Sequence, residues 1–159
     1  MTIDADSFRS VLGRFASGIT VVTTIDAEGR DVGMTVSAFS SVSLTPPLVQ
    51  VCIDQAASMY GALQQAERFG INVLASEQEA LSRRFAAVDS SHRFDGIGYA
   101  RGESGVVLLE EALAHLECRM HARHDAGDHT IFIGEVERAS ARDGRPMLYY
   151  RGGYAQLER

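Results

Sequence analysis

The sequence contains no lysine, and all 15 of its basic side chains are arginine. A lysine amine is needed for a Schiff base with a carbonyl substrate and for a Walker-type phosphate loop, so both kinds of site are excluded. Any phosphate group must therefore be bound by arginine, by hydroxyls, by main-chain N–H groups or by the start of a helix.

Features that define several other classes of protein are also scarce. Two cysteines, Cys52 and Cys118, are too few for a disulfide scaffold. No apolar run approaches the roughly 20 residues that span a bilayer, and the N-terminal stretch MTIDADSFRS is acidic where a signal peptide is basic. The net charge of -6 disfavours binding to nucleic acid or to an anionic membrane. We expect a cytoplasmic protein that binds neither.

What remains is the composition of an ordinary globular protein. Hydrophobic residues make up 45% of the chain and charged residues 23%. A chain of 159 residues is long enough to bury a core of its own. Since no repeat, low-complexity tract or proline-rich linker divides the sequence, we expect a single domain over residues 1–159.

The pattern of apolar residues predicts three helices and six or seven strands. The helices are expected to start at Asp6-Ser7, to cover about residues 59–68, and to follow a capping box from Ser76 to Glu79. The strands are expected at residues 19–26, 31–39, 48–54, 69–75, 114–124, 129–138 and 147–150. Residues 89–105 are expected to form a long loop. Because strands and helices do not alternate regularly, we expect an α+β chain, mainly antiparallel β, with peripheral helices around a barrel or sandwich.

The common signatures of dinucleotide and hydrolase sites are absent. Gly96-x-Gly98-x-x-x-Gly102 has the wrong final spacing for a dinucleotide fingerprint and lies in the predicted loop. Gly102-Glu-Ser104-Gly105 misses the nucleophile elbow by one residue. The histidines form no paired metal-ligand motif, and we expect no metal, although ligands that are distant in sequence leave such a site open.

The stretch GMTVSAFSSVSLTPP, residues 33–47, is rich in small hydroxyl side chains. They are Thr35, Ser37, Ser40, Ser41 and Ser43. One interpretation is a half-buried strand that runs into a serine-rich turn. The other is a polar strand edge, against which a flat heterocycle lies and pairs with successive main-chain N–H groups. The residues alone do not decide between these interpretations.

Two further stretches have both a structural and a functional interpretation. In Gly127-Asp128-His129-Thr130, glycine and aspartate are typical of a β-turn, while a histidine at the start of a strand suits proton exchange or the orientation of a ligand. In YYRGGY, residues 149–154, the tyrosines fit either a strand packed on the core or a surface that stacks on a nucleotide base.

Taken in this order, these stretches resemble the short-chain flavin reductase family, the reductase components of two-component flavin monooxygenases. The segments that carry the resemblance are FASGITVVT (15–23), GMTVSAFSSVSLTPP (33–47), FGINVL (69–74), RF (84–85), RFDG (93–96), GDHTIFIGEV (127–136) and LYYRGGY (148–154). The resemblance implies a split β-barrel that binds FMN or FAD near the interface of a homodimer. It also implies a hydride donor, NADH or NADPH, and a partner monooxygenase that receives the reduced flavin.

The resemblance further implies which residues contact the cofactors. On the flavin side they are Thr35, Val36, Ser37, Ala38, Ser41, Cys52, Ile53, Asp54, Ser58, Arg83, Arg84 and Phe85. Among these, the serines at 41 and 58 and the two arginines are expected near the phosphate. On the nicotinamide side they are His129, as the catalytic residue, and Tyr149, Tyr150, Arg151 and Gly152. A non-catalytic flavin-binding protein, a sensor or carrier, is the alternative, and the intact nicotinamide side favours the enzyme.

Overall fold

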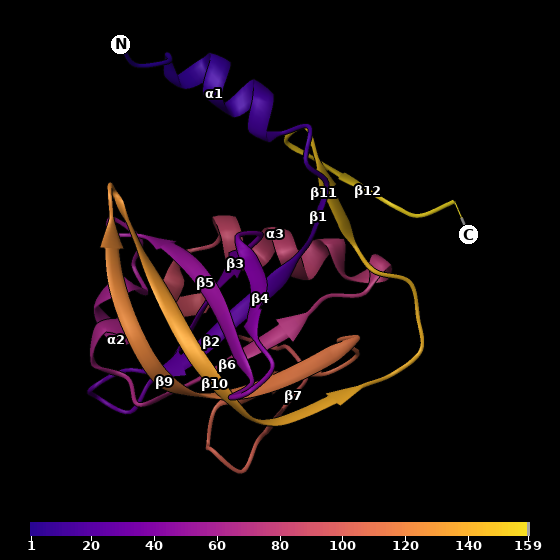
Figure 1. Ribbon diagram of the computed structural model, residues 1–159. Coiled ribbons are helices and arrows are strands. Elements are labelled where there is room, and N and C mark those ends of the chain that lie inside the picture. Colours follow the sequence, from indigo (N-terminus) through magenta and orange to yellow (C-terminus); the bar gives the residue numbers. More distant parts are fainter. Residues whose placement is uncertain (159) are drawn as a thin grey trace.

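The computed structural model describes residues 1–158 and shows a strongly curved antiparallel sheet with helices on its outside (Figure 1). Its elements are α1 (Ala5–Leu12), β1 (Ser17–Gly18), β2 (Thr20–Ile25), β3 (Asp31–Val36), β4 (Phe39–Ser43), β5 (Leu48–Asp54), α2 (Tyr60–Gln65), β6 (Arg68–Val73), η1 (Ser76–Gln78), α3 (Glu79–Ala87), η2 (Ser90–His92), β7 (Tyr99–Arg101), β8 (Val107–Leu109), β9 (Ala114–Ala126), β10 (His129–Ala141), β11 (Leu148–Tyr150) and β12 (Gly153–Ala155). None of the helices within residues 1–158 has the length and apolarity needed to span a membrane.

Seven strands form the main sheet, in the order β3-β2-β6-β9-β10-β5-β4. Every neighbouring pair in it is antiparallel. The edge strands β3 and β4 are consecutive in the chain, with only Ser37 and Ala38 between them. The sheet must therefore curl until its two edges meet at this connection, which makes a barrel split between β3 and β4. The predicted α+β split barrel with peripheral helices is confirmed.

The inside of the barrel is filled by apolar side chains from most of its strands. Phe69, Ile71 and Phe132 are completely buried there. The β-branched strand β2 buries five consecutive residues, as a strand covered on both faces does. Its buried threonines keep hydrogen-bond partners, since the Thr20 hydroxyl donates to the Val36 carbonyl at 2.7 Å. A second buried cluster lies between α3 and the sheet.

One polar residue of β9, Glu117, is buried. The alternation of residues 114–124 places Glu117 on the polar face with Arg119 and His121, but Glu117 is only 6% exposed. Its carboxylate accepts the N–H and the hydroxyl of Ser104 at 2.8 and 2.6 Å, so its burial is compensated by hydrogen bonds. The segment 89–105 that this contact anchors is not wholly a loop, because it includes η2 and β7, which pairs with β8.

The start of α3 does not use the predicted capping box. Gln78, rather than Glu79, reaches back, and its Oε1 accepts the Ala75 N–H at 2.9 Å. The result is a turn of 3-10 helix, η1, ahead of α3. The Ser76 hydroxyl donates instead to its neighbour Glu77. The prediction placed the correct helix but the wrong cap.

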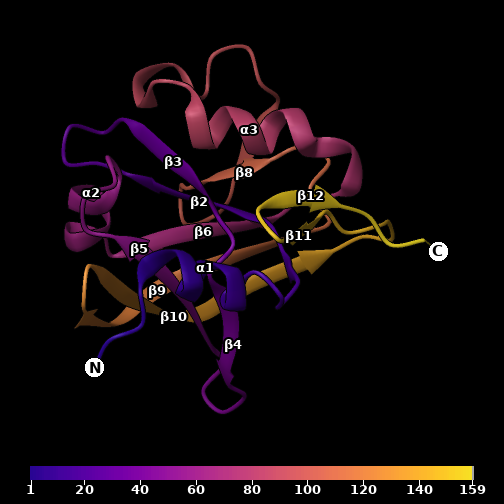
Figure 2. The same cartoon turned by 90° about the horizontal axis from the view of Figure 1, so that it is seen from above.

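Helix α1 stands off the barrel, at the end towards which the β9–β10 hairpin points (Figures 1 and 2). It begins earlier than predicted, because Asp4 is its N-cap and accepts the Ser7 N–H at 2.9 Å. None of its residues is buried. The apolar side chains left exposed along it and just beyond are Phe8, Val11, Leu12 and Phe15. The helix meets the C-terminal hairpin where the Arg151 N–H donates to the Gly13 carbonyl at 3.0 Å.

Gly134 on β10 permits close packing inside the barrel, and its substitution tests that packing. A Cβ at this position would lie 2.6 Å from Phe69 Cζ and 2.8 Å from Cys118 Cβ. We expect Gly134→Ala to lower the free energy of unfolding by about 1–3 kcal/mol, as overpacking does. The matched control is Gly61→Ala in α2, where a Cβ would meet nothing within 4 Å. The control is expected to gain about 0.5–1 kcal/mol in urea titrations. Equal stability of the two variants would contradict this packing.

Candidate functional site

The two residues that cross the split of the barrel leave main-chain donors facing solvent. Ser37 and Ala38 are both exposed. Their carbonyls are used, since the Ala38 carbonyl accepts the Cys52 N–H at 3.0 Å and the Ser37 carbonyl accepts the Phe39 N–H. Within residues 1–158, neither Ser37 N–H nor Ala38 N–H donates to a protein acceptor. Successive free N–H groups on an exposed strand edge are the donors that a flat heterocycle requires, which favours the ligand interpretation over a plain turn.

Strand β5 runs beside this connection. Cys52 is half-buried, Ile53 is only 1% exposed, and Asp54 is exposed at the end of the strand. Burial raises the pKa of the Cys52 thiol, so at neutral pH it is an uncharged surface group. The Asp54 carboxylate is oriented by its own turn, where Oδ1 accepts the Ala56 N–H at 2.8 Å. Because the Ile53 side chain is buried, this residue would meet a ligand at the strand edge mainly through its main chain.

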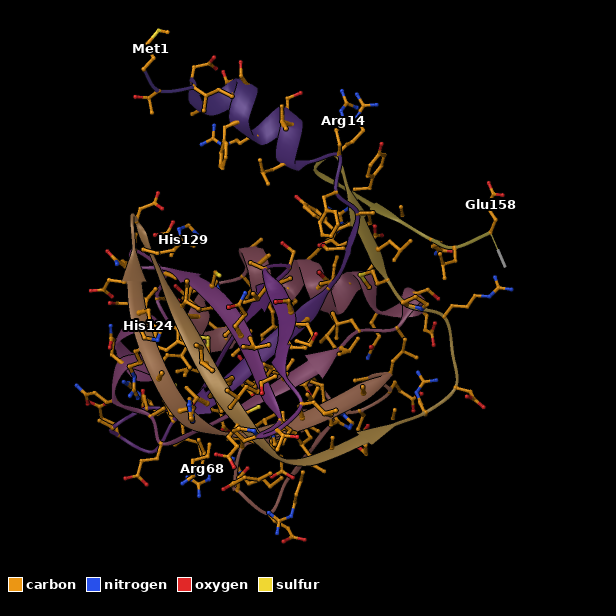
Figure 3. The ribbon with its side chains drawn as sticks, viewed as in Figure 1. Met1, Arg14, Arg68, His124, His129 and Glu158 are labelled. Carbon is orange, nitrogen blue, oxygen red and sulfur yellow. The ribbon has the colours of Figure 1, made fainter. Side chains whose placement is uncertain are left out.

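His129 reaches the same strand from the other side. It is directly opposite Asp54 in the pairing of β10 with β5, and Figure 3 shows it near the tip of the β9–β10 hairpin. Its Nδ1 lies 2.7 Å from Asp128 Oδ1, and this hydrogen bond lowers the pKa of the Asp128 carboxyl. Because a carboxylate only accepts, Nδ1 carries the proton and Nε2 is left to contact a ligand.

Helix α3 is joined both to the strand edge and to the C-terminal hairpin. The Thr35 hydroxyl donates to the Ser82 carbonyl at 2.6 Å. The buried Ser82 hydroxyl lies 2.8 Å from the Tyr154 hydroxyl. The guanidinium carbon of Arg83 lies 4.7 Å from the centre of the Tyr154 ring, and Tyr149 meets that ring edge-on at 5.9 Å. These contacts bring the predicted nicotinamide segment next to the predicted phosphate segment.

Ser82 and Tyr154 were not predicted as site residues. Tyr154 belongs to the YYRGGY stretch that was singled out, whereas nothing in the sequence marks Ser82. Their contact joins residues separated by 72 positions, which only the folded chain reveals.

The side chains of Arg84 and Phe85 are used by the fold. Arg84 Nε donates to the Arg93 carbonyl at 2.7 Å, and its Nη2 donates to the carbonyls of His92 and Asp95. Phe85 is completely buried and packs edge-on against Phe94 at 5.0 Å between ring centres. Arg83 is the neighbouring arginine that stays accessible, with 64% of its side chain exposed and a 3.4 Å ion pair to Glu79.

The other predicted residues lie on the same side of the barrel or on the C-terminal hairpin. Ser41 is exposed on β4, opposite Val49 of β5, and Ser58 is exposed in the connection from β5 to α2. No hydrogen bond joins either serine to Arg83 within residues 1–158. The hairpin turn consists of Arg151 and Gly152, both with positive φ (52° and 76°), as in a type I′ turn.

A cleft of about 770 Å³ lies along the outer side of α3 and is distinct from this exposed strand edge. Leu81, Val88 and Ile97 make up much of its apolar lining, and Arg83 and Arg84 reach it. Neither the segment 35–38, nor 52–54, nor His129 lines it. In the described part of the chain, no group of three or more metal-ligand side chains is placed to hold a metal ion.

Known proteins were compared with this chain by sequence and by structure. A family model described as a flavin reductase like domain matches residues 12–158. An FMN reductase (NADH) from Agrobacterium fabrum is 44% identical over 153 residues, covering 96% of this chain and 86% of that protein. The reductase subunit of a flavin-dependent monooxygenase from Rhodococcus jostii is 40% identical, covering 98% of this chain and 80% of that protein.

A solved structure is similar over nearly its whole length. The NADH:FAD oxidoreductase of Streptomyces globisporus, in complex with NAD and FAD fragments, matches with a TM-score of 0.91 and 37% identity. The match covers 99% of this chain and 96% of that one. The family model, the relatives and the split barrel agree, and this chain belongs to the flavin reductase family.

Proposed function

We propose that this protein is an NADH-dependent flavin reductase that supplies reduced flavin to a partner monooxygenase. The observation that carries the proposal is the placement of two free N–H donors, at Ser37 and Ala38, beside the strand that also pairs with His129. A flavin-binding protein without turnover would not need the second of these features. The similar proteins named above are reductases and, in one case, a monooxygenase subunit, which supports the same choice.

The strand edge suits the flavin ring. When bound, the flavin accepts a hydride from the reduced nicotinamide. Ser37 and Ala38 would direct their N–H dipoles at the edge of the ring where negative charge develops, and this stabilises the reduced state. Val36 is 5% exposed and offers only its main chain, while Thr35 is held to α3 through Ser82. Cys52 and Asp54 would line the flank of the ring.

The phosphate of the flavin would be bound by Arg83 with the hydroxyls of Ser41 and Ser58. Arg83 supplies the positive charge, since the chain has no lysine and the Nε and Nη2 groups of Arg84 donate to three carbonyls. Relatives of this chain are named for FMN in one case and FAD in another, and NADH is the donor in both.

The nicotinamide would lie between the flavin and His129. His129 Nε2 would orient the carboxamide or ring, and the Tyr149 to Gly152 segment would close over it from the side of α3. The protein's contribution is to stack two rings at about 3–3.5 Å, the distance at which hydride transfer is productive. We therefore assign His129 to positioning first and proton exchange second.

We also infer that the protein is a homodimer and acts in the cytoplasm. The uncovered apolar side chains on α1 and just beyond it, among them Phe8 and Phe15 at 53% and 82% exposure, support an interface at this surface. A second copy seated on α1 would also cover the open strand edge near the split. Both cysteines are free thiols, which suits a reducing compartment.

The first prediction from this proposal concerns turnover. We expect the purified protein to oxidise NADH, followed at 340 nm, only when FMN or FAD is added. Testing both flavins against NADH and NADPH would also assign the preferred pair. Flavin binding without NADH or NADPH oxidation in any combination would instead support the non-catalytic alternative.

The second prediction concerns His129. We expect His129→Ala to raise the KM for NADH about tenfold, the effect of one lost ligand contact, and to leave the dissociation constant for flavin within about twofold. Steady-state kinetics and flavin fluorescence measure the two quantities. The control is His121→Ala, since His121 is exposed on β9. Identical kinetics of the two variants would remove the proposed role of His129.

The third prediction concerns assembly. We expect the wild-type protein to have twice the mass of one chain in size-exclusion chromatography with light scattering. Val11→Asp should weaken the dimer more than about tenfold, because it places a charge in the apolar stripe that the dimer would bury. Ser10→Asp, on the same exposed helix, should leave the mass unchanged. A monomeric wild-type protein would exclude the dimer.

A further inference from the structure

The residue that follows His129 is the centre of a small polar cluster. Thr130 is completely buried. Its hydroxyl donates to Asp125 Oδ1 at 2.8 Å, lies 3.3 Å from the Tyr60 hydroxyl, and accepts from Gln55 Nε2 at 3.4 Å. We call Thr130, Asp125, Tyr60 and Gln55 the hairpin latch. A hydroxyl has one proton and two lone pairs, so these three contacts use its full capacity.

The hairpin latch joins the β9–β10 hairpin to α2 and to the turn after β5. Asp125 is directly opposite Thr130 in the pairing of β9 with β10. Tyr60 is the first residue of α2, and its hydroxyl, whose own proton is directed at Thr130, accepts from Gln64 Nε2. Gln55 immediately follows β5. One buried oxygen thus connects the end of the hairpin to α2 and to the turn after the proposed flavin strand.

The hairpin latch also holds the main chain of His129 on both sides. The Gln55 N–H donates to the Asp128 carbonyl at 2.9 Å. The side-chain amide of Gln55 donates to the His129 carbonyl at 3.1 Å, in addition to its contact with Thr130. The two peptide groups that flank the His129 Cα are therefore both fixed relative to β5.

The position of His129 in the fold makes such anchoring necessary. The histidine opens β10 at the free end of two strands of 13 residues each. Only Gly127, with φ +64°, and Asp128 lie beyond it in the turn. Free ends of hairpins open locally at low cost in free energy. A displacement of about 1 Å at a positioning group can reduce a rate by up to about a hundredfold.

We propose that Thr130 is a positioning residue that acts through His129. The buried hydroxyl is not required to fill space, since valine has nearly the same shape. What it adds is the set of polar contacts that fixes the hairpin end against α2 and β5. The inference rests on the proposed function, in which His129 Nε2 faces the nicotinamide.

The test compares three threonine variants in the full-length protein. Thr130→Val should raise the KM for NADH about fivefold to tenfold with an unchanged dissociation constant for flavin, and Thr130→Ser should restore most of the loss. Thr23→Val is the matched control, because Thr23 is also completely buried and its hydroxyl donates to the Val107 carbonyl at 2.8 Å. The control should lose comparable thermal stability and keep its KM.

A double-mutant cycle separates positioning from general destabilisation. In the His129→Ala background, Thr130→Val should produce no further rise in KM, because the group it positions is gone. Equal effects in both backgrounds would overturn the inference, as would an unchanged KM in the single variant.

A measurement without turnover keeps the inference testable if the proposed function fails. Amide hydrogen exchange of residues 125–130 in the free protein should accelerate about tenfold in Thr130→Val and stay unchanged in Thr23→Val. Unchanged exchange in Thr130→Val would show that the hairpin latch does not hold the hairpin. An inactive wild-type protein, or a kinetically silent His129→Ala, would count against the proposed function, while exchange would still decide whether the latch holds the hairpin.

Discussion

Much of this structure depends on the fact that the two edge strands, β3 and β4, do not pair with each other. A sheet edge normally carries unpaired donors that invite association with another chain. Here the curvature of the sheet brings both edges to one place and spans them with Ser37 and Ala38 alone. The register shifts between β9 and β10, before Gly134 and after Val136, bend the longest strand pair and so permit that curvature. Because these strands do not pair, the N–H groups of Ser37 and Ala38, on which the proposed flavin site depends, stay available to a ligand.

Arginine replaces lysine throughout, and the structure shows how most of these side chains are used. Arg93 Nη1 donates to the Gly33 carbonyl at 2.8 Å and so ties the segment after α3 to β3. Arg123 Nη2 donates to the carbonyls of Leu63 and Ala66 at the end of α2. The planar guanidinium suits these sites because it offers several donors in fixed directions. Arg83 differs from them, since its guanidinium lies over the Tyr154 ring and remains exposed.

The strands could be predicted because their signal is local. Alternation and β-branched residues were sufficient for β2, β5 and β10, and the split barrel followed from the family resemblance. The errors concern polar groups whose partners are distant in the chain or whose alternatives are close in energy. Glu117 is buried because Ser104 supplies two donors. The turn of helix ahead of α3 is capped by the Gln78 side chain rather than by the predicted Ser76–Glu79 box. The site residues stay predictions of the family resemblance, which named both Arg83 and Arg84 and could not tell that the fold leaves Arg83 the more accessible.

A continuous set of contacts connects α1 to the proposed flavin edge. Gly13 accepts from Arg151, the hairpin leads from Arg151 to Tyr154, Tyr154 meets Ser82, and Ser82 accepts from Thr35. A second copy that covers α1 would therefore contact the same framework of residues that would hold the cofactor. Coupling of this kind is reciprocal: if assembly raises the affinity for flavin, flavin raises the affinity of assembly by the same factor. The concentration of free flavin would then set how much of the protein is assembled.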